Sequence, residues 1–244
     1  MINLQSLNIH SFSYPILKTD CLIETSKYND LKQNWPKFTD FQTTSAGQIS
    51  RNNLELKRGN RNYHTIYPLF RNLYDSFDSK DFRAFLKSQL DLDNASKYNG
   101  FVGDFDTSEL IMHIAESRDG YENPWHVDTR GRIIHFLIYF GDETITEGGE
   151  LGIANHKKLN NYSEYKQYPN IDDLEGMRYI KPKDNVGIFI LSQNNSYHKG
   201  CFTKGLRRFI YAGYTNKNGD AWITKNWSNK RSFNEEVKYQ KLKI

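Results

Sequence analysis

The sequence has few cysteines, few prolines and no long apolar run. Its 244 residues include two cysteines and six prolines. Cys21 and Cys201 lie 180 positions apart, so they do not form the disulfide framework of a small secreted domain, and they suit a reducing compartment. No apolar run approaches the roughly 18 residues that a membrane-spanning helix needs, and the first residues lack the pattern of a secretory signal. We therefore expect a cytoplasmic, globular protein with no membrane partner.

The excess of positive charge belongs to the C-terminal end. The chain has 33 Lys and Arg residues against 29 Asp and Glu residues, a net charge of +4. Residues 217–244 hold seven basic and three acidic residues, so the preceding 216 residues hold 26 of each and are neutral. A neutral body does not suit a protein built around a polyanion. We expect nucleic acid not to be the main partner, with the basic tail keeping that alternative open.

The chain reads as one domain, residues 1–244, in three parts. Residues 1–100 are expected to form a helical N-terminal support, with helix and loop only. One helix is expected from about Asp20 to Asn34 with Asp20 as its N-cap, and another from about Ser79 to Leu90 after a Ser79 cap. Residues 45–62 between them are polar and give a weak structural signal.

Residues 101–216 have a different pattern, and residues 217–244 form the basic tail. Short runs of β-branched and aromatic residues, separated by turn residues, are typical of strands; they are Leu110–Ala115, Ile133–Phe140, Val186–Leu191 and Arg207–Tyr214. Several short strands with few helices between them favour an antiparallel sandwich or barrel. The polar segment Asn160–Asp173 is expected to be an inserted loop or short helix.

One short motif carries the chemistry, Trp125-His126-Val127-Asp128. Side chains two positions apart on a strand share a face, so His126 and Asp128 can reach one point. His198 lies just beyond the strand that ends at Leu191 and supplies a third donor. Two imidazoles and one carboxylate form a facial triad with open positions, which favours non-heme Fe(II), with tetrahedral zinc as the competing choice.

A second feature is an arginine pair in the last strand, Arg207 and Arg208. An arginine that points into an apolar barrel needs an anion, and its planar fork suits a carboxylate. A dicarboxylic cosubstrate would meet the metal with one end and the arginine with the other. Alternation puts Arg208 with Ile210 and Ala212 on one face and Arg207 on the opposite face. We assign the role to Arg208, and Arg207 takes it if the register is shifted by one.

These elements, taken together, resemble the Fe(II)/2-oxoglutarate-dependent oxygenase superfamily, in particular its prolyl 4-hydroxylase-like group. The matching parts run in family order from about Leu110 to Asn216. They are Trp125–Asp128, Gly131-Arg132 with the strand Ile133–Phe140, Glu147–Leu151, Ile180–Pro182 with the strand Val186–Leu191, and finally Tyr197-His198 and Arg208.

The resemblance implies a mainly β fold with flanking helices, built on a double-stranded β-helix (jelly-roll) core. It implies iron held by His126, Asp128 and His198, and the distal carboxylate of 2-oxoglutarate bound by Arg208, with Tyr139 at a position where relatives use a tyrosine for the same carboxylate. The implied cofactors are Fe(II), 2-oxoglutarate as cosubstrate and O2, with ascorbate as an optional addition.

The resemblance also implies the reaction, in which an unactivated C–H bond is hydroxylated while 2-oxoglutarate becomes succinate and CO2. Asp128 favours hydroxylation over halogenation, because related halogenases carry a small residue there. We expect the substrate to be a free amino acid or small metabolite. A prolyl residue of a peptide or protein is the first alternative. A nucleic-acid oxygenase and a non-catalytic jelly-roll binding protein are further alternatives.

Three other residues require an interpretation. His135 falls on the same face as Tyr139 and is expected to border the pocket without being a ligand. His113 lies in an apolar strand and can face the barrel interior. Cys201 lies three residues after His198, but the triad is complete without it.

Overall fold

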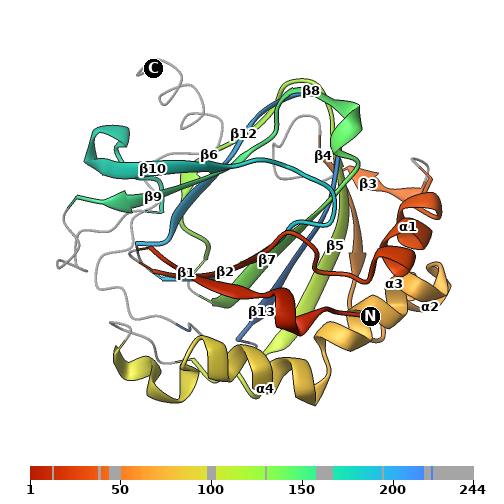
Figure 1. Cartoon of the computed structure of the whole chain (residues 1–244), viewed down its shortest axis with the longest axis horizontal. Helices are drawn as coiled ribbons and strands as arrows, with labels where there is room; N and C mark the ends of the chain where they lie inside the picture. Colours follow the sequence, from red (N-terminus) through yellow and green to blue (C-terminus); the bar gives the residue numbers. More distant parts are fainter. Residues whose placement is uncertain are drawn as a thin grey trace.

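The computed structural model describes residues 1–12, 14–37, 40–43, 51–97, 103–129, 131–157, 167–193, 195–216 and 221. Two antiparallel sheets form two layers, and helices cover the outer side of the larger sheet (Figure 1). This is the expected mainly β, jelly-roll architecture with flanking helices. None of the helices in these ranges is both long and apolar enough to cross a membrane.

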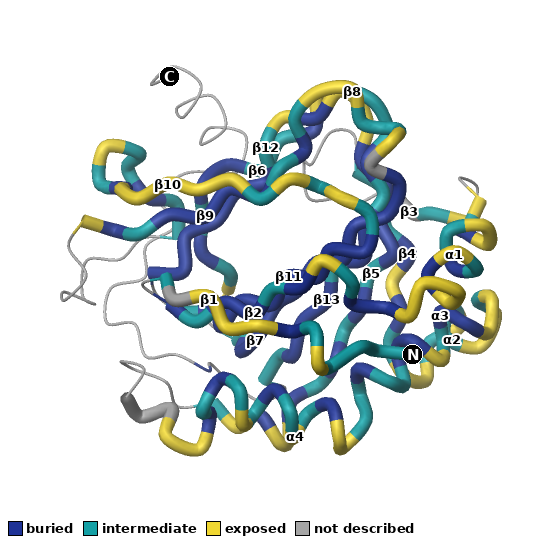
Figure 2. Tube along the Cα trace, viewed as in Figure 1, coloured by how far each residue is buried: buried dark blue, intermediate teal, exposed yellow. Residues whose placement is uncertain are grey.

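The larger sheet has eight strands in the order β1-β2-β11-β7-β13-β5-β4-β3. Their bounds are β1 Asn8–Ser11, β2 Pro15–Thr19, β11 Gly187–Leu191, β7 Arg132–Phe140, β13 Arg207–Thr215, β5 Glu109–Ser117, β4 Arg51–Leu56 and β3 Gln42–Thr43. The four strands predicted from the sequence are β5, β7, β11 and β13, and they form the middle of this sheet. Because near-continuous apolar runs suit strands that pack on both faces, these four strands are largely buried (Figure 2).

The smaller sheet has five strands and faces the first. Its order is β10-β9-β12-β6, and β8 pairs with β12 in addition. Their bounds are β6 Tyr121–His126, β8 Ile145–Gly148, β9 Leu151–His156, β10 Leu174–Ile180 and β12 Tyr197–Gly205. His198 therefore lies within a strand and not merely beyond one.

The two faces of the larger sheet belong to different cores. The helix-covered face contributes Leu54, Met112, Phe136, Ile210 and Ala212 to a cluster with Phe70, Phe77, Phe82 and Leu86. The inner face contributes Ala115, Leu137, Tyr139 and Phe209 to a second cluster that also contains Leu151 and Ile153 of β9. The space between the sheets is thus lined by the inner cluster.

Four helices lie in the N-terminal part of the chain: α1 Thr25–Gln33, α2 Arg61–Thr65, α3 Pro68–Phe77 and α4 Lys80–Gln89. The prediction for α4 is confirmed, since the Ser79 side chain accepts a hydrogen bond from the Phe82 backbone N–H, as an N-cap does. The prediction for α1 is confirmed only in part. Its N-cap is Glu24 and not Asp20, because residues after β2 remain extended until Glu24.

The expectation of helix and loop only for residues 1–100 is wrong. Strands β1, β2, β3 and β4 extend both edges of the larger sheet. β4 falls in the segment 45–62 that gave a weak signal, because only Leu54 and Leu56 of its six residues are buried. The first half of the predicted insertion Asn160–Asp173 and nearly all of the basic tail lie outside the described residues; Ile171–Asp173 forms a short 3-10 helix.

Candidate functional site

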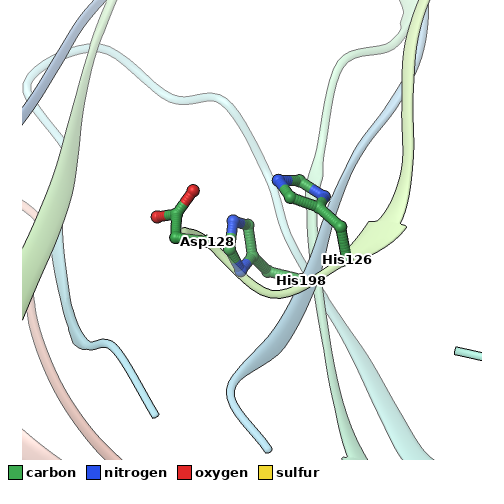
Figure 3. Close-up of side chains that lie close together, drawn as sticks. All are labelled: His126, Asp128 and His198. Atoms are coloured by element: carbon green, nitrogen blue, oxygen red, sulfur yellow. The ribbon is translucent and has the colours of Figure 1, made fainter. Parts of the chain in front are cut away.

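The strands β6 and β12 bring three metal-ligating side chains together. His126 is the last residue of β6 and pairs with His198 of β12 directly across the ladder. Asp128 follows His126 by two positions and turns into the same space. One ligand atom from each of His126, Asp128 and His198 lies within 4.8 Å of the others. Figure 3 shows these three side chains lying close together. Two imidazoles and one carboxylate at this spacing suit a divalent transition metal.

Backbone carbonyls fix the orientation of both imidazoles. His126 Nδ1 lies 2.7 Å from the carbonyl oxygen of Pro124, and His198 Nδ1 lies 3.0 Å from that of Ser196. A carbonyl only accepts, so each Nδ1 carries the proton and each Nε2 keeps its lone pair for a metal. Burial lowers the pKa of both rings, and His198 is lowered well below its usual range. Both imidazoles are therefore in the neutral form that binds metals.

The carboxylate of Asp128 is held by three neighbours. His135 Nδ1 lies 2.9 Å from Oδ2, Tyr211 Oη lies 3.4 Å from each carboxylate oxygen, and Arg132 Nη1 lies 3.8 Å from Oδ2. Burial alone would raise the pKa of Asp128, but His135 and Arg132 together hold it well below its usual range. Asp128 is therefore ionised and fixed in position. His135 lies beside the site as expected, where its Nδ1 is close to Asp128 Oδ2 and also forms a hydrogen bond of 3.0 Å with Ser192 Oγ.

A cavity of about 200 Å³ extends from these three residues between the sheets. Its lining is Arg51, Tyr121, Asn123, His126, Asp128, Leu137, Leu151, His198, Gly200, Arg207, Phe209 and Tyr211. The cavity thus joins the three candidate ligands to two arginines through an apolar middle section. A charged ligand with a short carbon chain fits such a lining.

Arg207 lies in this cavity, remote from the helices, and is only 2% exposed. Its Nη2 donates to Tyr139 Oη at 3.1 Å, and its guanidinium lies over the rings of Tyr139 and Phe209. Its Nε is buried without a hydrogen-bond partner, and no carboxylate of the described residues lies within 4.0 Å of its nitrogens. Burial raises the pKa of Tyr139, so its hydroxyl keeps its proton. Together they make a site for a carboxylate.

Arg208 lies on the opposite face, so the predicted choice between the two arginines is wrong. Its Nε donates to Glu116 Oε1 at 3.1 Å, and its guanidinium lies 6.0 Å from the centre of the Trp35 ring. The alternation along β13 is as expected. However, Ile210 and Ala212 share the face of Arg208 and pack against the helices, whereas Phe209 and Tyr211 share the face of Arg207 and line the cavity.

The interpretations of His113 and Cys201 can also be compared with the structure. His113 stacks with Tyr211, their ring centres 6.3 Å apart, so it faces the interior as expected. Cys201 does not belong to the candidate ligand group, and burial raises its pKa to about 11. Sequence reasoning missed Arg51, which reaches the cavity from β4. The Arg-Asn-Asn-Leu-Glu-Leu pattern of that strand, polar on one side and apolar on the other, was the available signal.

Residues 112–216 match the model of the 2OG-Fe(II) oxygenase superfamily. No curated protein matches the chain. Among solved structures, a prolyl-4-hydroxylase from Pseudomonas putida is similar with a TM-score of 0.55 and 10% identity, over 84% of this chain and 95% of that one. A prolyl hydroxylase from Trichoplax adhaerens, in complex with a hypoxia inducible factor oxygen degradation domain peptide fragment, has a TM-score of 0.56 and 14% identity, over 83% and 84%.

A third structure, an oxidoreductase of the 2OG-Fe(II) oxygenase family from Burkholderia pseudomallei, has a TM-score of 0.51 and 8% identity, over 87% of this chain and 88% of that one. At these identities the neighbours establish the fold alone. The superfamily whose model matches residues 112–216 uses Fe(II), 2-oxoglutarate and O2. The chain therefore has the fold of prolyl hydroxylases, and its residues 112–216 are similar to the 2OG-Fe(II) oxygenase superfamily.

Proposed function

We propose that the protein hydroxylates a free amino acid or small metabolite in the cytoplasm, with iron held by His126, Asp128 and His198. Arg207 and Tyr139 hold the distal carboxylate of 2-oxoglutarate. One observation carries this assignment: a single cavity contains three clustered ligand atoms and a buried guanidinium that has no carboxylate partner among the described residues. We also infer that the chain forms one domain, which is supported by a core cluster with residues from Leu7 to Ala221.

The donor set fits iron. Both Nε2 atoms have lone pairs available, Asp128 is ionised, and the three side chains approach from one side, which leaves further positions open. Asn123 Nδ2 lies 3.4 Å from His126 Nε2. This contact has to break when His126 Nε2 binds a metal. When bound, Fe(II) supplies the activation of O2 that couples decarboxylation of 2-oxoglutarate to hydroxylation of a C–H bond.

The other residues bind and orient. His135 is not assigned as a ligand, because it lies outside the group of clustered ligand atoms and its Nδ1 faces Ser192 Oγ and Asp128 Oδ2. It leaves the second carboxylate oxygen to the metal. Arg207 offers its fork to the distal carboxylate of the cosubstrate, with the protonated Tyr139 hydroxyl as an additional donor. This arrangement fixes the position of the cosubstrate along the cavity.

Apolar side chains separate the two ends of the cavity. Leu137 and Phe209 come from the larger sheet and Leu151 from the smaller one, and all three are buried. They enclose the carbon chain of the cosubstrate and limit the entry of water. Exclusion of water strengthens the ion pairs inside and protects a reactive site from side reactions.

The first candidate substrate is small, which suits a cavity of about 200 Å³ that also has to receive the cosubstrate. The second candidate is a prolyl residue of a peptide. It is favoured by the similarity to prolyl hydroxylases, one of them solved with a peptide fragment.

A succinate assay tests both candidates. The protein, Fe(II) and 2-oxoglutarate are incubated in air with free amino acids in one series and with proline-containing peptides in another. Stimulation of succinate formation by free amino acids, with hydroxylated product found by mass spectrometry, is the expected result. Stimulation by peptides alone would favour the second candidate. Absence of iron-dependent succinate in every reaction would contradict both.

A further inference from the structure

We propose that Asn123 couples binding of the metal to binding of the cosubstrate. Its side-chain amide competes with the metal for His126 Nε2, and it donates to the metal-binding end of the cosubstrate once both are bound. The inference rests on the proposed function and adds a positioning residue to that site. Asn123 lies on β6 and belongs to the lining of the cavity.

Asn123 and a metal compete for the same lone pair. His126 Nδ1 carries the proton that is directed at the Pro124 carbonyl, so Nε2 has one lone pair and accepts from one partner. Asn123 Nδ2 lies 3.4 Å from Nε2, beyond the usual range of hydrogen-bond distances, so this bond is weak. A metal has to displace it. Asn123 therefore lowers the affinity for a metal bound alone, by a small factor.

The amide lies where the ligands of a bound metal have their donor atoms. Metal–nitrogen distances to histidine are about 2.0–2.1 Å, so the donor atom of a second ligand at right angles lies about 3 Å from Nε2. Asn123 Nδ2, at 3.4 Å from Nε2, is at nearly this distance. When His126 binds a metal, the amide is therefore next to the coordination positions and needs another acceptor there.

Packing against β12 keeps the amide at this place. Asn123 pairs with Gly200 directly across the ladder. A Cβ atom added to Gly200 would lie 3.4 Å from Asn123 Cβ and 3.2 Å from Tyr121 Cε1. Both side chains thus lie close over the backbone of β12, where a larger residue would crowd them. The stem of Asn123 is held there, so its amide stays near the metal ligands when it gives up His126.

The order of side chains along β6 identifies the new acceptor. Tyr121, Asn123 and His126 all line the cavity, and the ring centre of Tyr121 lies 5.8 Å from the guanidinium carbon of Arg207. Asn123 thus lies between the carboxylate site at Arg207 and the metal ligands. A dicarboxylate that spans both ends passes Asn123 with its metal-binding end, whose oxygen atoms accept hydrogen bonds. A charged acceptor makes a stronger bond than a neutral imidazole does.

Two binding equilibria are linked in this way. A metal alone costs Asn123 its acceptor, and the cosubstrate restores a better one. Asn123 therefore weakens the first step and strengthens the second, and by reciprocity each ligand tightens the other through Asn123, in addition to direct chelation. A residue with a merely structural role would weaken both steps when it is replaced.

Calorimetric titration under nitrogen measures both steps without turnover. Mn(II) is titrated into the protein first, and 2-oxoglutarate is then titrated into the Mn(II)-loaded protein. Asn123→Leu, of similar size, is expected to bind Mn(II) alone about 2- to 5-fold more tightly, the loss of a weak neutral hydrogen bond. It should bind 2-oxoglutarate roughly 10- to 100-fold more weakly, the loss of a charged one. Asn123→Ala, which cannot obstruct the cavity, should change both affinities in the same directions.

Asn8→Leu is the matched control. Asn8 also lies on a strand and donates its side-chain amide, to the Ser6 carbonyl at 3.0 Å, but it is exposed and outside the cavity lining. Both affinities should stay at the wild-type values. The inference requires both changes at Asn123, so weaker binding in both steps, or a change in only one or in neither, would overturn it. Iron-dependent succinate formation by the wild type in air tests the proposed function separately, since it does not depend on how the variants bind.

Discussion

Separate exchange of Arg207 and Arg208, the two adjacent arginines of β13, for methionine should change stability in opposite directions, and only the Arg207 exchange should weaken binding of the cosubstrate. Arg207 is 2% exposed and lacks a carboxylate partner among the described residues, so the folded protein bears the cost of burying its charge. Arg208 is 30% exposed and forms an ion pair with Glu116, which is 3% exposed. Methionine keeps much of the apolar stem in both cases while removing the charge.

For Arg207→Met, the cosubstrate loses its charged partner. Hydrogen bonds to charged groups contribute about 1.5–3 kcal/mol, which corresponds to a KM for 2-oxoglutarate that rises roughly 10- to 150-fold. The metal-free protein should become more stable. Desolvation of a buried charge costs several kcal/mol, and the Tyr139 hydrogen bond and the ring contacts offset only part of it, so we expect a net gain of about 1 kcal/mol. For a chain of this length that raises Tm by about 2–4 °C.

For Arg208→Met, the buried Glu116 keeps only Arg118, whose Nη2 lies 3.7 Å away. Breaking a buried pair costs about 3–5 kcal/mol, but the exposure of Arg208 and the remaining Arg118 reduce this to about 1–2 kcal/mol. Tm should fall while KM for 2-oxoglutarate stays near the wild-type value. Succinate assays over a range of 2-oxoglutarate concentrations and thermal unfolding of the metal-free proteins give all four quantities. If Arg208→Met raises KM and Arg207→Met does not, the assignment of Arg207 is refuted.

Four further substitutions test the metal end and the cosubstrate end of the cavity. His126→Ala and His198→Ala should each abolish iron retention, measured by metal analysis after dialysis, and succinate formation; a variant that keeps both would contradict the ligand assignment. His135→Phe removes the polar contact with Asp128 and should weaken Fe(II) binding about 10- to 100-fold, measured by anaerobic titration. Tyr139→Phe removes one donor and should raise KM for 2-oxoglutarate roughly 2- to 10-fold, without loss of iron.

The middle of the larger sheet could be predicted from the sequence because its strands satisfy a local rule. Ile133–Phe140 and Arg207–Tyr214 are short runs dominated by β-branched and aromatic residues between turns, and no helix pattern competes with them. The pairing of His126 with Asp128 followed from the same kind of local rule, since a spacing of two residues on a strand fixes a common face. His198 is distant in sequence and was placed by the need for a third donor.

The choice between Arg207 and Arg208 could not be made in that way. Alternation divides β13 correctly, but both of its faces are apolar, because helices cover one side and the second sheet covers the other. Ile210 and Ala212 look as much like a barrel interior as Phe209 and Tyr211 do. Only the position of the helices, a long-range property, decides which face holds the cavity.

β4 was not predicted because it, too, depends on contacts between residues distant in sequence. Its position also indicates which part of the chain determines substrate specificity. β4 has only two buried residues, Leu54 and Leu56, which pack on the helix side, while its other face carries Arg51 and Asn53. A strand with so few apolar residues gives a weak signal alone and is stabilised by pairing with β5. Its polar face then extends the cavity beyond the elements that residues 112–216 share with the family. The shared core supplies the reaction, whereas an edge strand that pairs with it can change the substrate without disturbing the metal ligands. The sequence of that strand is therefore where we expect differences in substrate among proteins with this core to arise.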